Sequence, residues 1–220
     1  MRAWLERHPT PAAFLAGLMA AAALPPVYFL PGLLGFGLLV AVLWRSSPRP
    51  AGAFLRGTAF GFGFFLAGLY WVGIAFFADA ERFGALAAPA VLLLALGLAL
   101  TVGLAAALVA LRRWRRVEAQ ALAFAVAWTM AEPLRGGLGL QFPWNPVAVA
   151  WAASYPTLQA VAYLGTYGLS LLTVAAAGLS APWFLQEERG RRRAAALVAP
   201  VLSAAPLLAA GAWRLYAAGP

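Results

Sequence analysis

Long apolar segments alternate with short polar ones along the whole chain. A helix needs about 20 apolar residues to cross a hydrocarbon core of about 30 Å. The pattern therefore predicts an all-α fold, a polytopic transmembrane helical bundle of about seven spans. The apolar segments cover residues 11–24, 31–44, 57–78, 85–111, 119–131, 157–184 and 194–216. The third, fourth, sixth and seventh of them are long enough to cross a bilayer unaided.

Two places in this pattern leave the path of the chain open. The first two segments are short and are separated by Leu24-Pro25-Pro26, so they form either two short crossings or one re-entrant hairpin. We expect two crossings. The fifth segment is also short, and its apolar character resumes after Pro146. Prolines and a glycine cluster break helices in residues 132–155, the longest stretch that is neither clearly helical nor charged.

The composition agrees with a membrane-embedded chain. It is 64% hydrophobic and 10% charged, whereas soluble globular domains typically carry about 25% charged residues. Disorder is excluded more strongly, because disordered chains have low hydrophobicity. All 16 basic residues are Arg, Cys and Lys are absent, and His8 is the single histidine. The sequence therefore offers no disulfide, no thiolate or histidine metal site and no thiol nucleophile, and it implies no cofactor.

Arginines mark one side of the predicted membrane. If the N-terminus is cytoplasmic and the segments alternate, 13 of the 16 arginines lie inside, and only Arg82, Arg135 and Arg214 lie outside. This bias follows the positive-inside rule, so we expect a cytoplasmic N-terminus and a periplasmic C-terminus. The basic runs at 112–116 and 189–193 are interpreted as topology anchors at anionic lipid, and no nucleic-acid partner is expected.

Polar and aromatic side chains gather at three places on the predicted outer face. Ionisable residues are nearly absent within the spans, which argues against an ion pump or a proton-coupled transporter. No nucleophile–base set is visible, so we assign no catalytic residue and no metal ligand. The candidate substrate-positioning residues are Tyr70, Trp71, Glu132, Arg135, Gln141, Phe142, Trp144 and Asn145.

Each of the three places has a structural and a functional interpretation. Tyr70 and Trp71 end a span, where interfacial aromatic residues are common. Glu132 and Arg135 are three residues apart and can pair across one helical turn. That pair is either a loop salt bridge of little energetic value or a polar clamp at the rim of a lipid-facing cavity. The segment 141–146 is either an interfacial loop that dips into the headgroups or a wall that positions a lipid chain.

Several short motifs follow one another along the chain. Residues 57–71 read GTAFGFGFFLAGLYW, residues 128–136 read WTMAEPLRG, and residues 139–144 read GLQFPW. A Leu-Pro-Pro turn precedes them at 24–26, and LGTYG follows at 164–168. In order and spacing these motifs resemble the bacterial apolipoprotein N-acyltransferases, which carry similar Glu-x-Leu-Arg-Gly and Phe-Pro-Trp elements. The resemblance covers nearly all 220 residues.

The resemblance implies an enzyme of the bacterial inner membrane. Such an enzyme transfers an acyl chain from a phospholipid to the N-terminal diacylglyceryl-cysteine of an apolipoprotein, through a thioester acyl-enzyme. Its chemistry belongs to a periplasmic nitrilase-like domain with a Glu-Lys-Cys triad, which follows the seventh span. With no Cys and no Lys, residues 1–220 match the membrane half alone. We expect the nitrilase-like domain, which in the family follows this half, to be absent from the chain, and no triad residue is carried over.

Three hypotheses follow. In the first, the chain is the membrane half of an apolipoprotein N-acyltransferase. Its partners are then the phospholipid acyl donor, the diacylglyceryl apolipoprotein acceptor, the lipid bilayer and, where the catalytic domain is a separate polypeptide, a nitrilase-like chain. In the second, it is a stand-alone non-enzymatic scaffold or lipid-binding protein derived from that family. The third, a small transporter, is disfavoured by the scarcity of ionisable residues within the spans.

Overall fold

The computed structural model describes residues 2–46, 49–138, 141–185, 206 and 209–217. The described residues lie in helices, turns and irregular loops, with no β-strand among them, which confirms the all-α prediction. The predicted basic run at 189–193 and most of the predicted segment 194–216 lie outside the described residues. A bundle of seven spans and the orientation of its termini therefore stay predictions.

Ten numbered α-helices and five short 3-10 or π segments make up the regular structure of the described residues up to 185, and residues 209–217 are helical as well. The longer helices are α2 (Pro9–Ala21), α3 (Leu34–Ser46), α4 (Pro50–Gly68), α6 (Ala87–Ala110), α7 (Val117–Pro133) and α9 (Val161–Gly178). The shorter ones are α1 (Arg2–Arg7), α5 (Ala80–Phe83), α8 (Tyr155–Leu158) and α10 (Ala181–Leu185). The 3-10 and π segments are η1 (Leu30–Leu33), η2 (Tyr70–Asp79), η3 (Gly84–Leu86), η4 (Leu134–Leu138) and η5 (Val147–Ala153).

Three helical segments of the described chain are long and apolar enough to cross a membrane. They are Pro50–Gly68, Tyr70–Ala110 and Val161–Leu185. These three overlap the third, fourth and sixth predicted segments. Two shorter apolar segments, Pro9–Ala21 and Leu30–Ser46, overlap the first two. The hydropathy pattern thus located these helices correctly.

Two details of the predicted segments are wrong. The third was expected to begin at Gly57, but α4 begins at Pro50, because proline fits the first turn of a helix. Arg56 therefore lies inside this helix, where a long side chain can bury its stem and keep its charged end in water. The sixth predicted segment is not one continuous helix. It is interrupted at Gly165, whose φ of 66° lies in the left-handed region that favours glycine.

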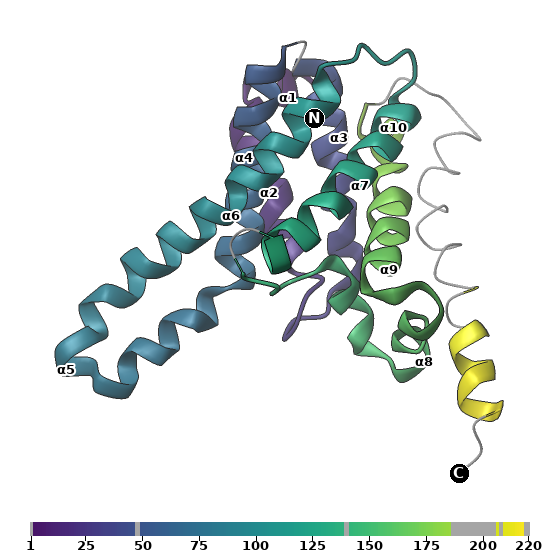
Figure 1. Ribbon diagram of the computed structural model, residues 1–220. Coiled ribbons are helices and arrows are strands. Elements are labelled where there is room, and N and C mark those ends of the chain that lie inside the picture. Colours follow the sequence, from purple (N-terminus) through teal and green to yellow (C-terminus); the bar gives the residue numbers. More distant parts are fainter. Residues whose placement is uncertain (1, 47–48, 139–140, 186–205, 207–208, 218–220) are drawn as a thin grey trace.

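The longer helices pack into one bundle (Figure 1). α4 packs along α6 and also against α2, while α7 packs against α9 and α6. Two glycines bring α4 and α6 close together. A Cβ added to Gly57 would lie 2.6 Å from the Cβ of Ala106, and one added to Gly61 would lie 2.9 Å from the Cα of Ala99. A four-residue glycine spacing is typical of closely packed helices in lipid.

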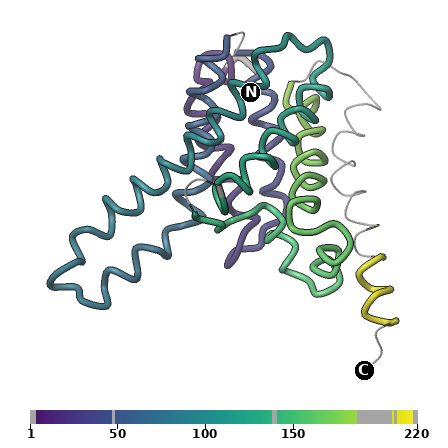
Figure 2. The backbone as a smooth tube through the Cα atoms, viewed as in Figure 1, coloured from purple at the N-terminus to yellow at the C-terminus, as the bar shows by residue number. Residues whose placement is uncertain are grey.

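An arm extends from the bundle between α4 and α6. In Figure 2, η2 runs outward beside the N-terminal half of α6, and α5 closes the tip. The tip carries Asp79, Glu81 and Arg82, all of them exposed. The charged turn at residues 79–82 therefore lies far from the body of the bundle (Figure 1).

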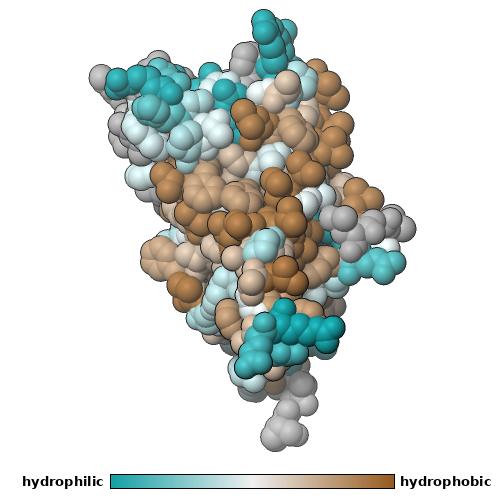
Figure 3. Space-filling model, turned by 90° about the vertical axis from the view of Figure 1, so that its left-hand side faces the viewer, coloured by the Kyte–Doolittle hydropathy of each residue, from teal (hydrophilic) through white to brown (hydrophobic). Residues whose placement is uncertain are grey.

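Much of the outer surface is apolar. Figure 3 shows a broad hydrophobic band on one face, with hydrophilic groups above and below it. α6 alone exposes Leu92, Leu93, Leu96, Leu100, Leu104 and Leu108. Soluble proteins rarely expose so large a contiguous apolar area. The surface is that expected of a protein surrounded by lipid.

Aromatic rings fill the core of the bundle. Trp128 of α7 lies among Phe36, Phe60 and Phe64, with ring centroids 5.0, 6.1 and 5.4 Å apart and the rings nearly perpendicular. All four side chains are fully buried, and edge-to-face contact is a favourable arrangement for such rings. This cluster holds α7 against α3 and α4. It thereby fixes the position of the last turn of α7, where the candidate site begins.

Candidate substrate-positioning site

Glu132 connects the last turn of α7 to the loop that follows. Its side chain is buried, and its Oε1 accepts hydrogen bonds from the indole Nε1–H of Trp128 and the backbone N–H of Val147, each at 3.0 Å. Trp128 lies one turn earlier on the same helix, whereas Val147 begins η5. Removing this acceptor would leave two buried donors unpaired, which is costly. The carboxylate is therefore a fixed connection between two elements.

A second set of contacts holds η5 against α9. The backbone N–H of Ala148 donates to Ser170 Oγ at 3.1 Å, and the indole of Trp151 donates to Thr173 Oγ1 at 2.7 Å. Ser170 and Thr173 are both buried and lie three residues apart on one face of α9. The sequence analysis did not single out these residues. The signal that could have found them is a pair of hydroxyl residues at helical spacing within an apolar segment.

Arg135 is buried beneath aromatic rings in η4, directly after α7. It is 2% exposed, and its guanidinium carbon lies 5.1 Å from the ring centroid of Phe65 and 5.5 Å from that of Trp128. Both contacts have cation–π geometry. Its Nη1 also donates a long hydrogen bond of 3.4 Å to Thr101 Oγ1. Burial lowers the pKa of the Arg135 guanidinium, and the neighbouring charge of Glu132 opposes that shift.

Glu132 and Arg135 do not form the direct ion pair that their spacing allows. No contact of 4 Å or less joins the two charged groups in the described part of the chain. α7 ends at Pro133, and Arg135 lies in the π-turn that follows. The Glu132 carboxylate instead accepts from the indole N–H of Trp128 and the amide of Val147, while the Arg135 guanidinium lies over the ring of Trp128.

The segment 141–146 packs over the end of α7. The backbone N–H of Phe142 donates to the carbonyl of Arg135 at 2.7 Å, and its half-buried ring packs on the core. Gln141 and Asn145 have φ angles of 51° and 58°, which are uncommon outside glycine and are best tolerated by Asn and Asp. The Asn145 amide nitrogen is buried beside Gly68, with no hydrogen-bond partner in the described structure. A side chain at Gly68 would collide with it.

Three aromatic side chains, Trp71, Phe142 and Trp144, form what we call the aromatic rim. Trp144 is 53% exposed and meets Trp71 edge-on at a centroid distance of 5.3 Å, while Phe142 lies 6.4 Å from Trp144. The indole of Trp71 donates to the Gly68 carbonyl at 3.1 Å, which fixes the orientation of its ring. The rim is thus an exposed apolar surface held in place by backbone hydrogen bonds.

The structure brings most of the candidate residues together at one end of α7. Glu132 and Arg135 lie buried beneath the segment 141–146, and Asn145 and the aromatic rim lie above them. Tyr70 and Gln141 lie next to them in the chain, and both are exposed. No ring contact or hydrogen bond of the Tyr70 side chain occurs in the described structure.

Comparison with known proteins gives one consistent result. A family model described as the apolipoprotein N-acyltransferase N-terminal domain matches residues 16–179. The apolipoprotein N-acyltransferase of Caulobacter vibrioides is 43% identical over 188 residues, which are 84% of this chain and 35% of that protein. The enzymes so named from Rhodopseudomonas palustris and Nitrosomonas europaea are 38% and 34% identical, over 74% and 82% of this chain and 31% and 36% of theirs. The chain thus spans about a third of the length of these relatives.

Proposed function

This chain belongs to the apolipoprotein N-acyltransferase family, whose N-terminal domain it matches, and from that premise we propose that it is the membrane half of an inner-membrane acyltransferase. The reaction moves an acyl chain from a phospholipid to the N-terminal diacylglyceryl-cysteine of an apolipoprotein. The part of these residues is to admit both lipid-bearing substrates from the bilayer and to position them. Since the 220 residues contain no Cys and no Lys, a Glu-Lys-Cys triad would come from other residues, on the same or on a separate polypeptide.

The aromatic rim is the observation that carries this proposal. Trp and Tyr side chains combine an apolar ring with a polar edge, so they suit the level where acyl chains meet headgroups. The Trp144 side chain is exposed, yet contacts with the rings of Trp71 and Phe142 hold it in place. A surface fixed before binding loses less conformational entropy when it orders a lipid.

Burial divides the candidate residues into two roles. Trp71 and Trp144 are exposed and can touch a lipid, whereas Glu132 and Arg135 are 3% and 2% exposed and cannot. We therefore assign the last two as positioning residues, which hold the segment 141–146 and η5 in place. In this assignment Glu132 and Arg135 do not form a polar clamp that contacts substrate. The aromatic rim is the surface that contacts the lipid instead.

The test is acyl transfer by the full-length enzyme, measured with a phospholipid donor and a diacylglyceryl-peptide acceptor. Trp144→Ala is expected to lower kcat/KM by about tenfold, equivalent to one lost contact of about 1.4 kcal/mol. Arg135→Ala should lower it further and also loosen the loop. Trp4→Ala is the matched control, because Trp4 is 41% exposed and lies on α1, at the other end of the bundle. Normal turnover by Trp144→Ala and Arg135→Ala, with intact membrane insertion, would remove the rim and its buried support from the mechanism.

A second candidate function is a stand-alone lipid-binding scaffold. The fixed and exposed aromatic rim supports it, since such a surface could hold a lipid without any chemistry. Affinity purification from native membranes separates the two. Recovery of a nitrilase-like domain, fused to this chain or bound to it, together with thioester formation would exclude the scaffold.

A further inference from the structure

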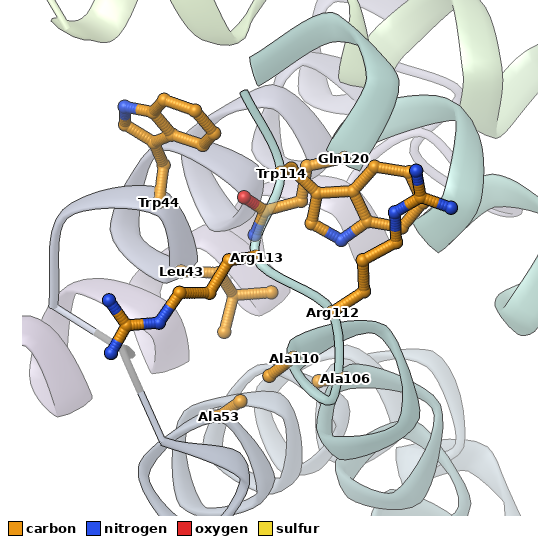
Figure 4. Close-up of a pocket in the computed structure, with 9 residues that line it drawn as sticks. All are labelled: Leu43, Trp44, Ala53, Ala106, Ala110, Arg112, Arg113, Trp114 and Gln120. Atoms are coloured by element: carbon orange, nitrogen blue, oxygen red, sulfur yellow. The ribbon is translucent and has the colours of Figure 1, made fainter. Parts of the chain in front are cut away.

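A pocket of about 220 Å³ (Figure 4) lies at the start of α7, whereas the aromatic rim lies at the end of that helix. It opens between the ends of α3, α4, α6 and α7, beside the loop that joins α6 to α7. Gln120 lines this pocket, and Glu132 lies beneath the rim, so the two sites are separated by twelve residues of α7, or about 18 Å along its axis. The pocket is therefore separate from the substrate-positioning site.

The walls of this pocket combine positive charge with an indole and a buried amide. Arg112 and Arg113 are exposed at its edge. The Trp114 indole is fixed by a hydrogen bond of 2.9 Å to the Val109 carbonyl, and the Arg112 guanidinium lies 4.9 Å above its ring. Gln120 is 7% exposed. In Figure 4 its amide points toward the centre of the pocket, and it makes no side-chain hydrogen bond in the described structure.

The floor of the pocket is apolar and is built from the helices themselves. Leu43 of α3 and Ala106 and Ala110 of α6 form part of it. A free inorganic anion gains no free energy from contact with this apolar floor. A phospholipid gains from it, because its phosphate can bind the Gln120 amide between the two arginines, whose guanidinium groups lie to either side in Figure 4 and attract its charge, while its glycerol and first methylenes cover the alanines. Basic pockets between transmembrane helices are known to bind anionic headgroups.

We propose that this pocket binds the phosphate-bearing headgroup of an anionic phospholipid from the leaflet at the arginine-rich end of the bundle. Arg112 and Arg113 supply the charge, Gln120 donates to a phosphate oxygen, and Trp114 packs on the glycerol. The bound lipid then links the α6–α7 loop to α3 and stabilises the end of the bundle remote from the rim. This inference goes beyond the acyl-transfer function, because neither acyl substrate is needed for it.

The test is native mass spectrometry of the purified full-length protein, titrated in detergent with phosphatidylglycerol, phosphatidylcholine or inorganic phosphate. Neutralising Arg112 and Arg113 together, as R112Q/R113Q, should weaken phosphatidylglycerol binding by roughly 30-fold, at a factor of about five for each arginine. The control R115Q/R116Q removes the same charge from the same loop, but neither arginine lines the pocket, so a change of less than about threefold is expected. Ala110→Leu fills the pocket without changing charge and should weaken binding as well.

Three results would overturn the proposal. Equal losses in the two arginine pairs would mean that the loop attracts lipid through its charge alone. Binding of phosphatidylcholine as tight as that of phosphatidylglycerol would remove the anion selectivity. Protection of the pocket by inorganic phosphate alone, at the lipid's affinity, would identify a free-anion site. Should R112Q/R113Q fail to fold, Ala110→Leu decides the matter, because unchanged lipid binding in that variant would show that the pocket is not used.

Discussion

The carboxylate of Glu132 can be tested as the connection that orders the site. Glu132→Ala leaves the N–H groups of Trp128 and Val147 without their acceptor, in a place where the wild-type side chain is 3% exposed. Each buried donor left unpaired costs about 1–3 kcal/mol, and only the Val147 amide belongs to η5, so we expect a loss of about 1–3 kcal/mol in the local stability of η5. Glu132→Gln keeps one side-chain oxygen as acceptor. Its cost should be about 1–2 kcal/mol, since only the charge is lost.

Hydrogen exchange at the backbone amides of η5 measures this loss directly. An opening free energy lowered by 2 kcal/mol speeds exchange by roughly 30-fold, so the Val147 amide should exchange about that much faster in Glu132→Ala. Amides within α2 should keep their wild-type rates, because α2 packs against α3 and α4 and shares no hydrogen bond with the carboxylate. Thr129→Val is the matched control. Thr129 is buried on the same helix, and its hydroxyl has no hydrogen-bond partner in the described structure.

Wild-type exchange at Val147 in Glu132→Ala would refute the reasoning. η5 would then be held by its contacts with α9 alone. Combining Glu132→Ala with Ser170→Ala sharpens the test, because the two side chains bind consecutive backbone amides, at Val147 and Ala148. The two contacts hold the same element, so their contributions to its stability are not independent. The double variant should therefore lose less free energy than the sum of the two single losses. Strict additivity would show that the two contacts act independently.

Two further predictions concern close packing. Gly61→Leu should lower the free energy of unfolding by about 1–3 kcal/mol, and with it the unfolding midpoint, because α4 and α6 touch there. Gly97→Leu is the control. A Cβ at Gly97 meets nothing within 4 Å, so the midpoint of this variant should be unchanged. Equal midpoints for the two variants would contradict this packing. Gly68→Ala should displace the segment 141–146, seen as altered Trp fluorescence and slower acyl transfer in the full-length enzyme, since the new Cβ collides with the Asn145 amide. Adding Asn145→Gly should restore both signals, as glycine makes room and accepts the φ of 58°; no restoration would show that the collision is not the cause.

The sequence predicted the helices well because a helix in contact with lipid needs a long run of apolar residues, and such runs are easy to recognise. Helix starts were harder to predict. Arg56 marks a polar position, and the third segment was therefore expected to begin after it, yet α4 continues back to Pro50. Hydropathy reports whether a residue tolerates lipid, while helix ends depend on turn chemistry and on whether a long side chain can reach water. A charge near the end of a span is thus a weak marker of the end of its helix.

The candidate site shows a different limit of sequence reasoning. The spacing of Glu132 and Arg135 suggested that they pair with each other, because spacing along one helix reveals only neighbours on that helix. The partner that matters most, the amide of Val147, is fifteen residues away and becomes adjacent only after the chain has turned back through the segment 141–146. Ser170 and Thr173 were overlooked for a similar reason. Their role is to accept hydrogen bonds from another element, and no pattern within α9 identifies that element.

Among the contacts of the described residues, Arg112 and Arg135 each lie over a tryptophan ring, and their surroundings give them different roles. Arg135 lies over Trp128 and is 2% exposed, so no ligand can reach its guanidinium, and its charge serves the packing of η4. Arg112 lies over Trp114 at the exposed edge of the other pocket, where its hydrogen-bonding edge stays open to an anion. A cation–π contact is worth about 2 kcal/mol or more when desolvated and about 0.5–1 kcal/mol when exposed. Loss of Arg135 therefore appears first as disorder beneath the aromatic rim, whereas loss of Arg112 appears first as lost lipid, with the fold intact.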